Sequence, residues 1–87
     1  MSNEKFLEKA KELVKNYATE HLDKSDNLSE FNVYIVWMCK TLQNSKLLIS
    51  TSLPDKMYYE LTLNGDKNEI YFDAYKKIEN RCIKMEE

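Results

Sequence analysis

The stretch FNVYIVWMCKTLQNSKLLISTSLPDKMYYELTLNGDKNEIYFD, residues 31–73, decides the fold, because it reads as a series of antiparallel strands. Its first segment, Phe31 to Cys39, is dense in β-branched and aromatic residues, which suit a pleated and partly buried surface. Polar residues at 43–45 interrupt the apolar run and predict a turn before a second strand at 46–52. These two segments predict a β-hairpin.

The second half of the stretch predicts a further hairpin. Pro54 cannot donate a backbone hydrogen bond and separates the second strand from residues 57–63, where apolar and polar side chains alternate. Asn64-Gly65 then predicts a type I′ turn, since both residues tolerate positive φ. Residues 68–72 read as a short fourth strand. We expect an antiparallel meander of three or four strands.

Helices are expected on both sides of this meander. From Ser2 to about Leu22 the apolar residues recur every three or four positions, with Ser2 or Asn3 as the cap, and residues 23–27 form a polar connector. Near the other end the helical and strand patterns overlap at Asp73. Since Asp is a preferred cap, the spacing predicts a helix from Ala74 to about Met85.

The predicted fold is therefore a single α+β domain over residues 1–87, a two-layer sandwich of an N-terminal helix, an antiparallel three- to four-stranded meander and a C-terminal helix. The first strand is apolar on both faces, which is typical of a strand that is central or covered on both sides. If both helices pack on one face, strict alternation leaves an apolar patch on the other. That patch is the predicted protein interface, and it consists of Tyr34, Val36, Met38, Tyr58 and Tyr71. The alternative is that the helices lie on opposite faces and cover it.

Composition narrows the functional classes. Thirteen basic and fifteen acidic residues give a net charge of −2, so no global field favours nucleic acid or anionic lipid. No apolar run is long enough for a membrane span, and no signal-peptide core is visible. Two widely separated cysteines, Cys39 and Cys82, do not suggest a disulfide scaffold. We expect a cytoplasmic protein without membrane contact.

No catalytic, metal or cofactor site is expected. His21 is the only histidine and stands near the end of the first helix, where a structural role outweighs a catalytic one. Cys39 and Cys82 read as small apolar core residues, and one histidine with two distant cysteines does not make a zinc site. A calcium loop starting at Asp23 fails, since Leu28 stands where glycine is needed. The chain is predicted not to be an enzyme.

A basic run near the C-terminus offers an alternative function. Lys76, Lys77, Arg81 and Lys84 stand close to Tyr71 and Tyr75, a combination that single-stranded nucleic-acid binders use. The simpler interpretation is a solvated helix face with cations placed toward its C-terminal end. Because the chain is net acidic, the simpler interpretation is favoured and nucleic acid is not expected.

Four segments together resemble a family of short uncharacterised proteins from phages, prophages and Gram-positive bacteria; they are residues 34–44, 53–60, 64–67 and 73–77. The resemblance covers nearly the whole chain and implies a setting, with no activity or functional residue to transfer. Small phage-borne proteins without catalytic machinery often bind a host or phage protein, and inhibition of a host defence system is one example. The expected function is a non-enzymatic interaction module that binds another protein or itself as a homodimer.

Overall fold

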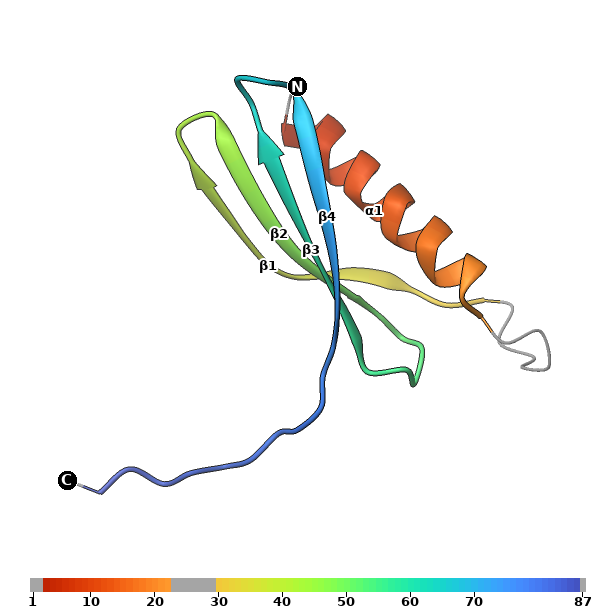
Figure 1. The fold of residues 1–87 in the computed structure, drawn as a ribbon, viewed down its shortest axis with the longest axis vertical. Helices are drawn as coiled ribbons and strands as arrows, with labels where there is room; N and C mark the ends of the chain where they lie inside the picture. The colour runs from red at the N-terminus through yellow and green to blue at the C-terminus, as the bar shows by residue number, and fades with distance from the viewer. Residues whose placement is uncertain (1–2, 23–29, 87) are drawn as a thin grey trace.

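The structure is a computed structural model that describes residues 3–22 and 30–86 (Figure 1). One helix, α1 (Asn3–Glu20), precedes four strands, which are β1 (Val33–Thr41), β2 (Asn44–Thr51), β3 (Met57–Asn64) and β4 (Glu69–Lys76). The α+β class, the N-terminal helix and the four-stranded antiparallel sheet are confirmed. The predicted cap at Ser2 and the connector at 23–27 lie outside the described residues.

The sheet is a simple meander in the order β1-β2-β3-β4, with every neighbouring pair antiparallel. β1 therefore lies at an edge, next to β2 alone. The expectation that this strand is central or covered on both sides is wrong. Its apolar character on both faces leaves Tyr34, Val36, Trp37 and Met38 substantially exposed.

The core lies between α1 and one face of the sheet. Phe6, Ala10, Val14 and Ala18 are spaced by four residues, so they form one stripe of the helix, and all are buried. Phe6, Ala10 and Val14 form one cluster with alternate residues of β2 and β3, which are Leu47, Ile49, Tyr59, Leu61 and Leu63. Tyr17 extends the contact to β4, with its ring centroid 5.3 Å from that of Phe72. In Figure 1 the helix runs alongside the strands on one side of the sheet, and no helix or strand of the described residues covers the opposite side.

The predicted C-terminal helix is absent from the described residues. Instead β4 continues to Lys76, with Asp73 opposite Glu60 and Ala74 opposite Tyr59, so the residues assigned to a cap and a first turn belong to the β3–β4 ladder. The strand alternation outweighed the helical spacing because pairing with β3 satisfies the backbone and packs Phe72, which is partly buried, against the core. A helix of about twelve residues is only marginally stable without such packing.

Residues 77–86, which we call the arm, have no regular structure and run away from the sheet (Figure 1). The first backbone amide of the arm, that of Lys77, donates a hydrogen bond of 2.8 Å to the carbonyl oxygen of Lys56. The chain has a radius of gyration of 15.2 Å, whereas a compact chain of this length has about 12 Å. The projecting arm accounts for much of this difference.

The turn between β3 and β4 does not have the type I′ geometry that was predicted for Asn64-Gly65. No glycine has positive φ, and the positive values fall on Leu42, Lys56 and Asn68. Gly65 is required for a different reason, since a Cβ there would collide with the backbone carbonyl oxygen of Gln43. The β1–β2 and β3–β4 turns thus touch. They are also joined by a hydrogen bond of 2.9 Å from Gln43 Nε2 to Asp66 Oδ1.

Candidate functional site

A β-bulge in β1 determines which side chains reach the uncovered side of the sheet. Ile35 pairs with Ile49 and Trp37 pairs with Leu48, so Val36 is an extra residue without a partner in β2. Beyond the bulge the alternation of β1 is inverted. Trp37 therefore joins the uncovered side, whereas Met38, opposite buried Leu47, lies on the helix side.

Cross-strand pairing arranges the uncovered side in three rows. They are Tyr34–Ser50–Tyr58–Tyr75, then Trp37–Leu48–Glu60–Asp73, then Cys39–Lys46–Thr62–Tyr71. We call this surface the open face. Four of its five aromatic side chains are between 44% and 52% exposed, namely Tyr34, Trp37, Tyr71 and Tyr75, and Tyr58 is partly buried among them. The open face is consequently an aromatic surface without a covering layer.

The predicted interface residues are only partly brought together. Tyr34, Tyr58 and Tyr71 share the open face, but Met38 lies on the other side and Val36 is the bulged residue. The sequence reasoning missed Trp37, because no sequence signal marks the bulge. It also missed Tyr75, although the alternation of Tyr71, Asp73 and Tyr75 was visible and a longer fourth strand would have included it.

The charges of the open face are mainly acidic. Glu60 is paired with Lys46 at 3.1 Å, and Asp73 stands directly opposite Glu60 on the neighbouring strand. At the far end the Tyr71 hydroxyl donates a hydrogen bond of 2.9 Å to Glu69 Oε2. This hydrogen bond and the nearby negative charge raise the pKa of Tyr71. The three rows therefore combine aromatic rings with two carboxylates and one lysine, and Glu69 borders them at one end. Lys56 and Lys77 border them at the other end.

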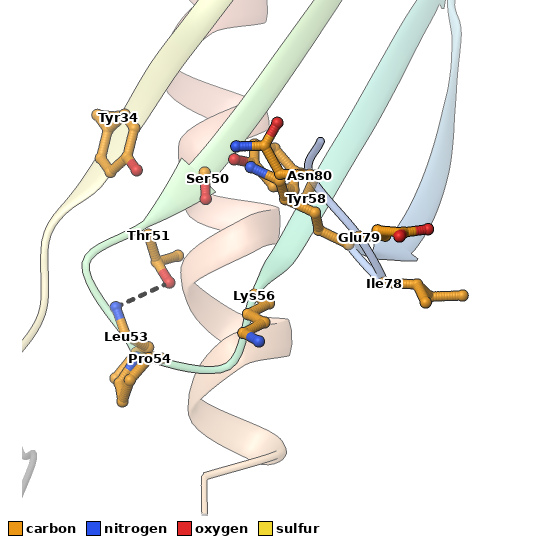
Figure 2. A pocket seen from close by; sticks show the side chains of 11 residues that line it. Tyr34, Ser50, Thr51, Leu53, Pro54, Lys56, Tyr58, Ile78, Glu79 and Asn80 are labelled. Atoms are coloured by element: carbon orange, nitrogen blue, oxygen red, sulfur yellow. Dashed lines mark hydrogen bonds between the residues drawn. The ribbon is translucent and has the colours of Figure 1, made fainter. Parts of the chain in front are cut away.

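Two hollows interrupt this surface. The first has a volume of about 360 Å³ and lies where β4 passes into the arm, between Tyr34, Tyr58 and the loop at Pro54 (Figure 2). A hydrogen bond from Leu53 N to Thr51 Oγ1, drawn in Figure 2, fixes this loop. The second, of about 390 Å³, lies at the opposite end between Trp37, Cys39 and Thr62 and has a mostly apolar lining. Both can take a side chain of a bound polypeptide.

The basic run predicted for the last helix is distributed over two elements. Lys76 ends β4, whereas Lys77, Arg81 and Lys84 belong to the arm. Lys77 Nζ lies 5.9 Å from the ring centroid of Tyr58, at the border of the open face. Arg81 is paired with Glu79 at 3.0 Å. These cations therefore do not form one helix face.

The remaining candidates show no constellation for chemistry. His21 stacks on Tyr17, and its Nδ1 donates a hydrogen bond of 2.8 Å to the Tyr17 carbonyl oxygen, a contact within the end of the helix. Cys39 and Cys82 are exposed, so their prediction as core residues is wrong. The bulge places Cys39 on the open face, and the missing helix leaves Cys82 in the arm. Among residues 3–22 and 30–86 no group of three His, Cys, Asp or Glu side chains could hold a metal ion.

Comparisons with known proteins give a family and no activity. No helix in the described parts of the chain is long and apolar enough to cross a membrane. No curated protein and no solved structure matches the chain. A protein-family model matches residues 7–85, which include most of α1, all four strands and nearly the whole arm. The chain therefore belongs to the family of unknown function DUF6275.

Proposed function

We propose that this protein is a non-enzymatic interaction module that binds protein through the open face. The observation that carries the proposal is the uncovered aromatic surface formed by Tyr34, Trp37, Tyr58, Tyr71 and Tyr75. Aromatic residues are enriched at protein interfaces, and several exposed aromatic side chains gathered on one uncovered face are typical of an interaction site. The Lys46–Glu60 ion pair and Asp73 lie among the rings and supply polar contacts that can give an interface its orientation.

The setting of this function rests on the sequence resemblance alone. A phage or prophage protein of this size, acting in the cytoplasm, would bind a host protein or a component of a host defence system. The open face is the surface that such a partner would meet, and α1 and the core would serve as its rigid support.

Tyr58→Asp tests the open face. Tyr58 stands between Ser50 and Tyr75 in the first row, so a carboxylate there would have to be desolvated by any partner that covers the row. We expect association, measured as the absolute mass by light scattering across a range of concentrations, to be lost. Far-UV circular dichroism and the urea midpoint check that the variant folds.

Asn16→Asp is the matched control for this variant. It makes the same change in charge on the solvent-exposed side of α1, away from the open face. We expect it to associate as the wild type does. If Tyr58→Asp also associates as the wild type does, the open face is not the interface.

A second candidate is weak binding of single-stranded nucleic acid. It is favoured by Lys77, which lies beside the Tyr58 ring and brings a cation to the aromatic rows. Glu60, Asp73 and Glu69 count against it, because they would repel phosphates from the same surface. Binding of a fluorescent oligonucleotide should then fall steeply between low and high salt. An absent or salt-independent signal would exclude this candidate.

A further inference from the structure

The arm exposes apolar side chains that its own domain does not cover. Ile78, Ile83 and Met85 are 92%, 76% and 87% exposed, although the arm holds only ten residues. In Figure 2 the side chain of Ile78 points away from Tyr34 and Tyr58, even though Ile78 helps to line the first hollow. So many large apolar side chains in one extended segment indicate that the arm is normally covered.

Only the first four residues of the arm, 77–80, border the open face of their own molecule, where they line the first hollow with Tyr34 and Tyr58. Lys77 is hydrogen-bonded to Lys56 at the end of the sheet, and from there the chain continues outward (Figure 1). Covering its own face would require the chain to reverse immediately after this bond. A second copy can receive the arm without any such reversal.

Charge makes a smaller contribution to the fit of arm and open face. From Lys77 onward the three cations, Lys77, Arg81 and Lys84, are balanced by an equal number of glutamates, so the segment is not basic overall. The middle row of the open face holds Asp73 beside Glu60, which is paired with Lys46. One cation of the arm can meet this row, so the contact depends mainly on apolar side chains.

Arm and open face also agree in size. Lys77 is held by its own Lys56, and the nine residues that follow it, 78–86, span about 30 Å when extended, which is the length of a nine-residue strand such as β1. Covering the exposed halves of four aromatic rings removes roughly 400 Å² per copy from water. With a similar area from each arm, two reciprocal contacts bury roughly 1,600 Å², the size of a stable interface.

We propose that the arm of one copy seats on the open face of a second copy and that the exchange is reciprocal, which builds a symmetric dimer. This inference rests on the proposed function, because it names the partner of the open face as a second copy of this chain. A reciprocal exchange closes on itself, so it gives a dimer and no longer assembly.

The experiment uses one variant of the arm and one of the face. Ile83→Asp places a carboxylate in the arm at an exposed position that contributes nothing to the core. Tyr58→Asp changes the open face. We expect the wild type to have twice the chain mass of 10.4 kDa and each variant alone to have the mass of one chain.

Mixing the two variants supplies the decisive result. The Tyr58→Asp chain keeps an intact arm and the Ile83→Asp chain keeps an intact face, so one arm–face contact can form between them. We expect a mixed dimer, weaker than the wild type because it has one contact where the wild type has two. Absence of any mixed dimer would overturn the proposal.

Other outcomes separate this inference from the proposed function. If Ile83→Asp still dimerises while Tyr58→Asp does not, a segment other than the arm covers the open face. That result overturns the arm exchange and leaves the open face as the interface. If both variants dimerise, for example by pairing of β1 edges, the dimer forms through another surface, which overturns the exchange and shows that the open face does not mediate self-association. A wild type that stays monomeric at all concentrations overturns the exchange and leaves the open face for a different protein. Tyr34→Ser serves as a second face variant should Tyr58→Asp not fold.

Discussion

Leu42 occupies the first position of the two-residue turn between β1 and β2, with φ of 57°. Only the first central residue of this turn has positive φ, which is the pattern of a type II′ turn and a place that glycine normally takes. The side chain gains nothing in return, since it is 83% exposed. The turn is therefore a local source of strain.

Leu42→Gly should stabilise the protein. Relief of the left-handed strain outweighs the extra unfolded-state entropy of glycine, and we expect a net gain on the order of 1 kcal/mol in the free energy of unfolding. Urea denaturation measures it as a higher midpoint at unchanged slope. Leu42→Ala retains a Cβ and the strain, so it should show no such gain. An equal gain in both variants would show that strain is not the cause.

Tyr59 is the residue whose ionisation should limit stability at high pH. It is buried beneath α1, and burial, followed by the nearby Asp55 and Tyr17, raises the pKa of Tyr59 to about 12 from a usual value of 10. Below pH 10 the phenol is neutral in both the folded and the unfolded chain. Between pH 10 and 12 only the unfolded chain ionises, so folding stability falls as the pH rises.

Tyr59→Phe should remove this part of the alkaline loss. The free energy of unfolding of the variant, measured by urea denaturation at several pH values from 9 to 12, should decline less steeply than that of the wild type. The comparison of slopes cancels any constant cost of losing the hydroxyl. Parallel declines in the two proteins would mean that Tyr59 does not contribute.

At the level of elements, the buried faces of the helix and strands with regular periodicity could be predicted, whereas the β-bulge that interrupts β1 could not. The helical stripe from Phe6 to Ala18 and the alternation of Leu47, Ile49, Leu61 and Leu63 specify their buried faces directly. The bulge at Val36 depends on how β1 meets β2, so strict alternation assigned Met38 to the wrong face. An inserted residue leaves no periodic signal, and every side chain beyond it changes sides.

The prediction of a C-terminal helix was wrong for a different reason, because a strand periodicity and a helix periodicity coexist in that part of the sequence. Ile70, Phe72 and Ala74 alternate, whereas Ala74, Ile78 and Cys82 repeat every four residues. Pairing with β3 makes this segment a strand. Such pairing is a tertiary interaction, so the local spacing of residues does not predict it. The open face was predicted as a surface but with an incomplete set of residues, because Trp37 and Tyr75 depend on these two elements.

For the whole molecule, size explains why one face stays uncovered. A domain of this length buries only about 60% of the surface that its unfolded chain exposes, and here a single helix covers a single side of the sheet. The arm carries apolar residues beyond the reach of that core. Exchange of arms would give the molecule a second buried layer without adding residues.

Trypsin provides a test of this arrangement in the unmodified protein. An exposed, extended arm should be cut after Lys77, Arg81 and Lys84 without any unfolding of the domain. If a second copy covers the arm, these cuts in the wild type should become slower as protein concentration rises. In Tyr58→Asp they should stay fast at every concentration, because its face cannot receive an arm.

The sites in α1 serve as the internal control. Lys9 and Lys11 lie in regular helix, so mass spectrometry should find their cleavage slow in both proteins as long as the domain is folded. Protection that is independent of concentration, or equal in the wild type and Tyr58→Asp, would place the cover of the arm elsewhere. Concentration-dependent protection that is lost in Tyr58→Asp ties the arm to the face because the substituted residue and the protected bonds then belong to different copies.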